Sequence, residues 1–215
     1  MSDGASFVGR PTKLPPAAVV FDLGNVLIGW DPHAAVAAAL GDDEARRFLS
    51  AADFDFLAWN HLQDAGRSWA DALAEIRDTH PHWAAHAEGY LAHFTESLGE
   101  VPGTADIVRG LRAAGVPMFG LTNWSAELYP HAPERFEVLT LLDEVIVSGR
   151  IKAAKPDVRA YRAAADAAGQ PLDRLLFVDD SPPNVEAAAA LGMDAIVFTG
   201  VDDLRRELEE RGLPV

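Results

Sequence analysis

Six polar residues fall where they could act together on one substrate. They follow four separate apolar runs of the chain: Asp22, the pair Thr122 and Asn123, Lys155, and the pair Asp179 and Asp180. Three carboxylates that meet at one rim repel each other strongly, so they must either shift in pKa or bind a cation. Oxygen ligands without cysteine or a nearby histidine pair favour Mg²⁺. The pattern therefore predicts a magnesium site at this rim.

Each of these residues also has an ordinary interpretation when it is taken alone. Thr122 could serve a turn, Lys155 could be a solvated side chain, and either aspartate of the pair 179–180 could cap a helix that begins near Pro182. The joint pattern is much less probable by chance than any single member, because all six residues follow predicted strands.

Those strands are predicted from five apolar runs separated by Ala-rich helical segments. The runs are Ala17–Leu23, Val116–Thr122, Leu141–Gly149, Arg174–Asp180 and Asp194–Gly200. Three of the helical segments close on glycine, which favours the left-handed cap conformation. Strand and helix in alternation indicate an α/β fold, a doubly wound, Rossmann-like parallel sheet. Ligands bind such sheets outside the carboxyl ends of the strands, which is where the six residues lie.

One segment interrupts this alternation. From about residue 32 to residue 100 only helical patterns occur, and Thr104 is expected to cap the helix that returns to the sheet. We interpret residues 32–100 as an all-α helical cap inserted into a core domain of residues 17–31 and 101–215. Residues 1–16 are polar and rich in proline toward their end, which is typical of a flexible tail.

The composition excludes several classes of partner. The 215 residues carry a net charge of −15, which argues against nucleic acid and against anionic membrane surfaces. The chain has no cysteine and no apolar run long enough to span a bilayer, so we expect a cytoplasmic protein with a small-molecule substrate. The sequence gives no indication of the oligomeric state.

The order of these motifs resembles the haloacid dehalogenase (HAD) superfamily of aspartate-nucleophile hydrolases. The strings FDLGNV, LTNWSAELYP and WNHLQDAGR look most like its phosphatase-like branch, and the resemblance runs from about Ala17 to Phe198. It implies that Asp22 is the nucleophile and that Lys155 is catalytic and stabilises the phosphoryl group together with Thr122 and Asn123. It further implies Mg²⁺ on Asp22, on Asp180 and on the backbone carbonyl of Gly24, with Asp179 as an outer acceptor or a ligand through water.

Gly24 departs from the family pattern. Most phosphatases of the superfamily carry an aspartate two residues after the nucleophile, which protonates the leaving group and then activates water. General acid–base help of this kind is worth roughly 10²–10⁴-fold. We therefore expect slow turnover unless another group substitutes, and Asp31, His33, His61 and Asp64 are the candidates.

The cap and the rim of the sheet supply the residues expected to contact the substrate: Trp30, Trp59, Asn60, Arg67 and Trp124. For each tryptophan alone, packing in the core is the more common role. The preferred function is a Mg²⁺-dependent phosphatase for a small phosphorylated metabolite, with sugar phosphates as one class. The alternatives are a 2-haloacid dehalogenase, whose halide leaves without a proton, and a weakly active binding or regulatory protein.

Overall fold

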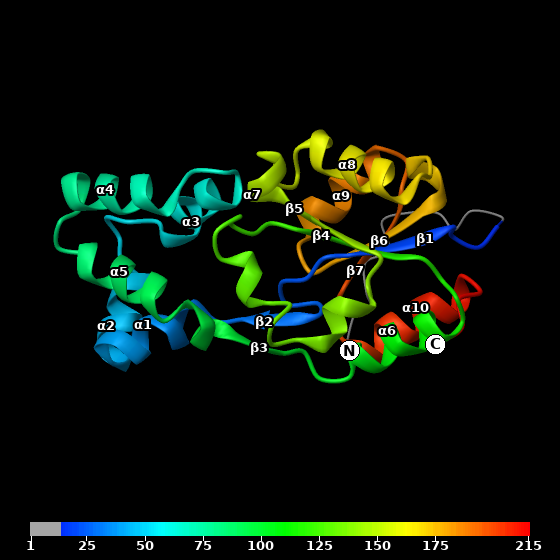
Figure 1. Ribbon diagram of the computed structural model, residues 1–215, viewed down its shortest axis with the longest axis horizontal. Coiled ribbons are helices and arrows are strands. Elements are labelled where there is room, and N and C mark those ends of the chain that lie inside the picture. The colour runs from blue at the N-terminus through cyan, green and yellow to red at the C-terminus, as the bar shows by residue number, and fades with distance from the viewer. Residues whose placement is uncertain (1–13) are drawn as a thin grey trace.

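A five-stranded parallel sheet between two layers of helices forms the core of the protein (Figure 1). The computed structural model describes residues 14–215. Of the tail expected at residues 1–16, residues 1–13 therefore lie outside the described residues. The strand order is β5-β4-β1-β6-β7. The strands are β1 (Ala18–Phe21), β4 (Met118–Thr122), β5 (Glu144–Val147), β6 (Leu175–Asp179) and β7 (Asp194–Val197). All five predicted strands are confirmed, although β5 begins only after the polar start of its run.

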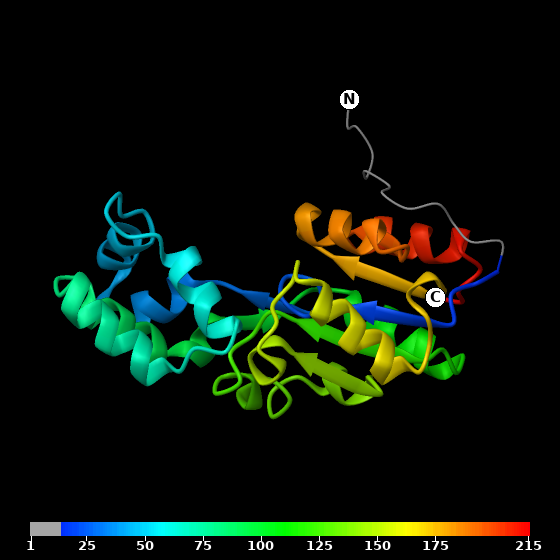
Figure 2. The ribbon, with the colours of Figure 1, turned by 90° about the horizontal axis from the view of Figure 1, so that it is seen from above.

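Alternating side chains of the strands pack against opposite helical layers. Val19 and Phe21 belong to the cluster beneath α6 (Thr104–Ala113) and α10 (Val201–Glu210), whereas Ala18 and Val20 face α8 (Val158–Ala168) and α9 (Pro182–Ala190). Figure 1 shows these layers edge on, and Figure 2 looks onto the face of the sheet, where the strands lie side by side. Burial on both faces explains why these strands read as continuous apolar runs. The fold class predicted from the sequence is therefore confirmed.

The helices of the core end as their glycines predict. Gly115, Gly169 and Gly192 all have positive φ, at 75°, 59° and 91°, directly after α6, α8 and α9. The start of α6 differs from the expectation. Gly103 is its N-cap in the left-handed region, and the Thr104 hydroxyl donates to the Val101 carbonyl at 2.9 Å instead of capping the helix.

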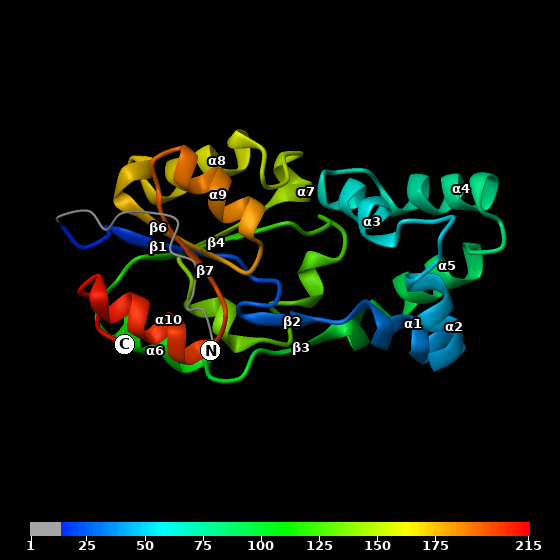
Figure 3. The same ribbon diagram turned by 180° about the vertical axis from the view of Figure 1, so that it is seen from behind.

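The inserted segment forms a helical cap beside the sheet (Figure 3). Its helices are α1 (Pro32–Leu40), α2 (Asp42–Leu49), α3 (Phe56–Asp64), α4 (Trp69–Thr79) and α5 (Ala84–Ala92). Its interior is a chain of aromatic contacts in which Phe48 lies 5.3 Å from Phe54 and 5.6 Å from Trp83, measured between ring centroids. The shorter helical elements lie mainly in loops: α7 (Ser148–Ile151), η1 (Phe94–Ser97), η2 (Tyr129–His131), η3 (Glu137–Leu141) and η4 (Leu172–Arg174).

Two short strands that the sequence did not predict join the cap to the core. β2 (Ile28–Trp30) and β3 (Leu98–Glu100) pair antiparallel, with Gly29 opposite Gly99. Three-residue strands with a glycine at the centre are too short to show an alternating pattern. Among the described residues no helix is long and apolar enough to cross a bilayer.

Candidate active site

The adjacent strands β1 and β6 bring Asp22 and Asp179 together. Phe21 is in register with Val178, and the Asp22 amide donates to the Val178 carbonyl at 2.7 Å, so both carboxylates emerge at the same edge of the sheet. Asp22 lies directly after β1 and is 8% exposed, while Asp179 ends β6 and is completely buried. A rigid strand end thus holds the carboxylate of Asp22 at the surface of the core.

A lysine bridges these two carboxylates. The Lys155 ammonium lies 2.9 Å from Asp22 Oδ1 and 2.6 Å from Asp179 Oδ2, and its side chain is fully buried. Burial favours the neutral amine, but Asp22 and Asp179 outweigh it and raise the pKa of Lys155. The backbone N–H of Leu23 donates to the same oxygen, Asp22 Oδ1, at 2.7 Å. Asp22 Oδ2 therefore remains the oxygen available for attack or for a metal.

Asn123 fixes the main chain of Lys155. Its amide oxygen accepts from the Lys155 N–H at 2.7 Å, and its amide nitrogen donates to the Lys155 carbonyl at 2.9 Å. This clamp uses the oxygen and one of the two amide hydrogens. The Asn123 side chain thus positions Lys155 and forms part of the pocket wall, and its expected contact with phosphoryl oxygens stays a prediction.

Asp179 is held on all sides. Asn184 Nδ2 lies 3.1 and 3.2 Å from its two oxygens, and the Ser181 amide donates to Oδ1 at 2.8 Å. With Lys155 on Oδ2, these contacts suit the supporting role expected for Asp179 more than direct ligation of a metal. Asn184 therefore orients this carboxylate.

The carboxylates nevertheless form a credible cation site. One oxygen each from Asp22, Asp179 and Asp180 lies within 4.8 Å of the others, and no other group of three or more such ligands occurs among residues 14–215. Burial, reinforced by Asp179 and Asp180, raises the pKa of Asp22, and burial also raises that of Asp180. A divalent cation would oppose both shifts, and hard carboxylate oxygens are the donors that Mg²⁺ prefers. The donor set thus fits Mg²⁺.

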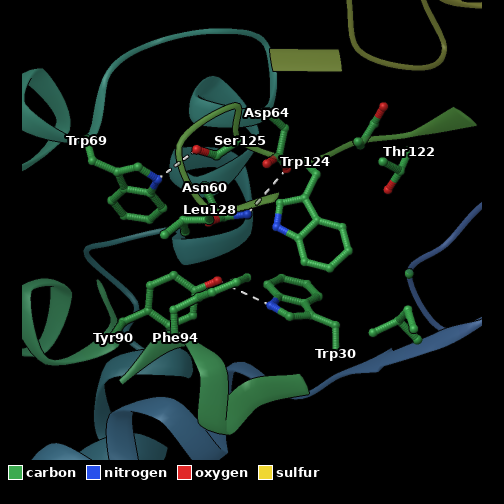
Figure 4. Close-up of a pocket in the computed structure, with 13 residues that line it drawn as sticks. Trp30, Asn60, Asp64, Trp69, Tyr90, Phe94, Thr122, Trp124, Ser125 and Leu128 are labelled. Carbon is green, nitrogen blue, oxygen red and sulfur yellow. Dashed lines mark hydrogen bonds between the residues drawn. The ribbon is translucent and has the colours of Figure 1, made fainter. Parts of the chain in front are cut away.

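A pocket of about 480 Å³, part of it open to solvent, extends from this rim to the cap. Gly24, Thr122 and Asn123 line its core end. Its remaining lining residues are mainly aromatic or come from the cap: Ile28, Trp30, Asn60, Asp64, Trp69, Tyr90, Phe94, Trp124, Ser125 and Leu128. No lysine or arginine belongs to this lining, and Asp64 is its one carboxylate. Figure 4 shows the rings of Trp30, Tyr90 and Trp124 around the space between them.

Contacts across the interface hold the cap against the core at this pocket. The Trp69 indole donates to Ser125 Oγ at 3.0 Å, and the Trp69 amide donates to Glu127 at 2.9 Å. The buried Ser148 hydroxyl donates to the Asp64 carbonyl at 2.6 Å and accepts from the Trp124 amide at 2.9 Å. These bonds connect α3, α4 and the loop after β4, so the cap side of the pocket is fixed relative to the sheet.

The structure brings three of the five expected substrate-contacting residues into the pocket, namely Trp30, Asn60 and Trp124. The other two lie outside its lining. Trp59 packs in the cap interior, 5.7 Å from Phe54. Arg67 turns toward the cap, where it forms an ion pair with Glu75 and donates to the carbonyl of Trp59. Its guanidinium therefore bonds to cap residues and does not line the pocket.

Of the four candidates for the missing acid, only Asp64 lines the pocket. Asp31 caps α1 by accepting from the His33 amide at 2.9 Å, and His33 lies 3.9 Å from Asp42. His61 is exposed. Sequence reasoning did not single out Trp69, Tyr90 or Phe94 as pocket residues, because an aromatic residue that lines a pocket and one that packs in a core have the same helical spacing.

Comparisons with known proteins agree with this geometry. The family model "haloacid dehalogenase-like hydrolase" matches residues 16–192. Phosphoglycolate phosphatase of Pseudomonas savastanoi pv. phaseolicola is 30% identical over 216 residues, covering 90% of this chain and 71% of that protein. Drimenol cyclase drtB of Aspergillus calidoustus is 25% identical over 206 residues. The match covers 91% of this chain, which spans only 38% of the cyclase's length.

Other matches include (S)-2-haloacid dehalogenases, over 41% of this chain. Among solved structures, a HAD family enzyme of Bacteroides thetaiotaomicron in complex with magnesium and inorganic phosphate superposes with a TM-score of 0.62. It is 20% identical, and the match covers 83% of this chain and 91% of that one. At this identity the likeness supports the fold.

Proposed function

Because this chain belongs to the haloacid dehalogenase-like hydrolase family and is therefore a hydrolase, we propose that it is a Mg²⁺-dependent phosphatase of a small phosphorylated metabolite. The observation that carries the proposal is the placement of Asp22: it is held by Lys155 beside the two further carboxylates of Asp179 and Asp180, and the rim around it opens into a pocket between the sheet and the cap. Phosphatases among the relatives add support.

In the proposed reaction Asp22 Oδ2 attacks phosphorus, the bond from phosphorus to the leaving oxygen breaks, that oxygen takes a proton from solvent, and an aspartyl-phosphate forms. Water then attacks that phosphorus and gives up a proton to solvent, which releases inorganic phosphate and returns the carboxylate. Bound at Asp22, Asp180 and the Gly24 carbonyl, Mg²⁺ would supply charge stabilisation for the phosphoryl oxygens. Lys155 offsets the repulsion between two anions, and Thr122 lies at the pocket end where the phosphoryl group would sit.

The dehalogenase alternative is less favoured by the site. A 2-haloacid brings its own carboxylate, yet the pocket lining contains no lysine or arginine to receive it. Asp179 and Asp180 beside Asp22 would add repulsion. The binding-protein alternative gains support only from Gly24, and the intact pairing of Asp22 with Lys155 is difficult to explain without turnover.

The test is phosphate release from a panel of phosphomonoesters that includes sugar phosphates, with Mg²⁺ and with EDTA, by the wild type and Asp22→Asn. We expect release that requires the metal and falls roughly 10⁴-fold or more in the variant. Release that survives in Asp22→Asn would contradict the assigned nucleophile. A folded protein that binds Mg²⁺ but releases phosphate from no compound would favour the binding protein, and haloacids would be tried next.

A further inference from the structure

The pocket has two chemically different ends. Gly24, Thr122 and Asn123 form the end at the sheet, where the proposed function places the phosphoryl group. Trp69 and Tyr90 lie at the other end, and Asp64 lies beside Ser125, between these rings and Thr122 in the view of Figure 4. The leaving group of the substrate must extend from the phosphate toward this far end. The residues there therefore indicate which kind of leaving group the pocket accepts.

The aromatic residues leave few hydrogen-bonding groups for a ligand. Trp30 Nε1 donates to the Tyr90 hydroxyl at 3.2 Å, and Trp69 Nε1 donates to Ser125 at 3.0 Å. The Asn60 amide donates to Asp64 Oδ2 at 3.3 Å. Trp124 Nε1 is buried and has no partner among the described residues. This part of the pocket therefore offers ring faces, the hydrogen of the Tyr90 hydroxyl, the remaining amide groups of Asn60 and one carboxylate. These groups are fewer than the donors and acceptors that the several hydroxyls of a pyranose ring carry.

Asp64 is a carboxylate without a cation. The Ser125 backbone N–H and the Asn60 amide hold it, and burial raises its pKa to about 7. Other titratable groups in this region are Tyr90 on α5, which interacts electrostatically with Asp64, Glu127 after β4, which accepts from the Trp69 amide, and Lys152, which follows α7 and lies beside Gly66. In the described chain none of them forms an ion pair with the Asp64 carboxylate. Arg67, three residues along, pairs with Glu75 instead.

We propose that the substrate's leaving group is cationic, so that the protein hydrolyses aminoalkyl phosphates whose ammonium group lies against Asp64 and the surrounding rings. This inference rests on the proposed phosphatase function. Aromatic faces attract cations through their negative quadrupole, and a desolvated carboxylate adds a direct charge partner. An aminoalkyl phosphate carries less net negative charge than phosphoglycolate, so the net charge of −15 on the protein repels it less. An acidic leaving group such as glycolate would face Asp64 with no cation to receive it.

The experiment compares two substrates that differ only in charge: phosphocholine and its neutral isostere 3,3-dimethylbutyl phosphate. For the wild type with Mg²⁺ we expect kcat/KM to favour phosphocholine by about 10-fold or more. In Asp64→Asn that ratio should approach one. Asp55→Asn is the matched control, because it removes one carboxylate from the other end of α3 and asparagine caps a helix as well as aspartate. Its ratio should equal that of the wild type.

The ratio compares two substrates on one preparation, so a partly unfolded variant does not distort it. A wild-type ratio near or below one, with p-nitrophenyl phosphate still hydrolysed, would overturn the cationic leaving group and leave the phosphatase intact. A preference for phosphocholine that persists in Asp64→Asn would overturn the role of Asp64. Absence of phosphate release from all three compounds by the Mg²⁺-loaded wild type would overturn both proposals.

Discussion

The rim of the sheet and the cap side of the pocket differ in the interactions that their side chains form. At the rim, Asp179 receives contacts from Lys155, Asn184 and the Ser181 amide, so a polar network fixes each group. On the cap side, rings dominate, and the carboxylate of Asp64 is held by amide N–H groups without a charged partner within residues 14–215. The difference teaches that a polar network holds the reacting groups at the rim, whereas the cap side presents ring faces and one carboxylate that no cation of the protein neutralises. Variants can test whether the two regions divide the work in this way.

Removal of the Lys155 charge should have the largest effect, because the rim depends on it. Lys155→Met leaves Asp22 and Asp179 buried without their cation, and such a loss typically costs about 3–5 kcal/mol of stability. We expect phosphate release to become undetectable and the urea midpoint to fall. The buried pair of Arg211 with Asp194 offers a control, since Arg211→Met should lower stability similarly but leave kcat unchanged. Retained activity in Lys155→Met would mean that the rim tolerates unpaired carboxylates.

A gain of function at Gly24 ranks next. An added Cβ at this residue meets no atom within 4 Å, so the backbone there accepts a side chain without a clash at its first atom. If the missing general acid limits the rate, Gly24→Asp should raise kcat by about 10² with alkyl phosphates. Gly24→Ala serves as the control, because it adds the Cβ without the acid. An unchanged or lower rate in Gly24→Asp, with Mg²⁺ still bound, would show that another group already supplies the proton or that chemistry is not limiting.

Part of this arrangement could be predicted from the sequence, and part of it could not. Asp22, Lys155 and Asp179 were identified from the ends of apolar runs, because a parallel sheet brings the carboxyl ends of its strands to one edge. The clamp of Asn123 on Lys155 could not be foreseen, since it depends on two loops that are 32 residues apart. The pocket residues Trp69, Tyr90 and Phe94 were missed because an aromatic residue packed in a core and one that lines a pocket show the same hydrophobic pattern in the sequence. The turn of Arg67 into the cap depends on Glu75, on the next helix.

A smaller effect concerns Asp64 and pH. Burial raises the pKa of this carboxyl from 3.8 to about 7 in the folded protein, so the native state binds more protons than the unfolded state between these values. Stability from Asp64 is therefore present at low pH and is lost as pH rises toward 7. Asp64→Asn lacks this dependence. We expect the Tm of the wild type minus that of the variant to fall between pH 4 and 7 and then to level off. A constant difference would place Asp64 in a solvated environment.

The smallest effect is expected at Arg67, and it sharpens the contrast between the regions. The guanidinium pairs with Glu75 and donates to Gln63 at 2.6 Å, both within the cap, so it stabilises the cap without reaching the pocket. Arg67→Gln should lower the free energy of unfolding by about 1–3 kcal/mol, the usual cost of lost charged hydrogen bonds. The value of kcat/KM should change by less than about twofold, for phosphoglycolate as for phosphocholine. A selective loss with phosphoglycolate would instead mean that Arg67 moves into the pocket and binds acidic substrates. The cap side would then favour anionic leaving groups and not the cationic ones that we propose.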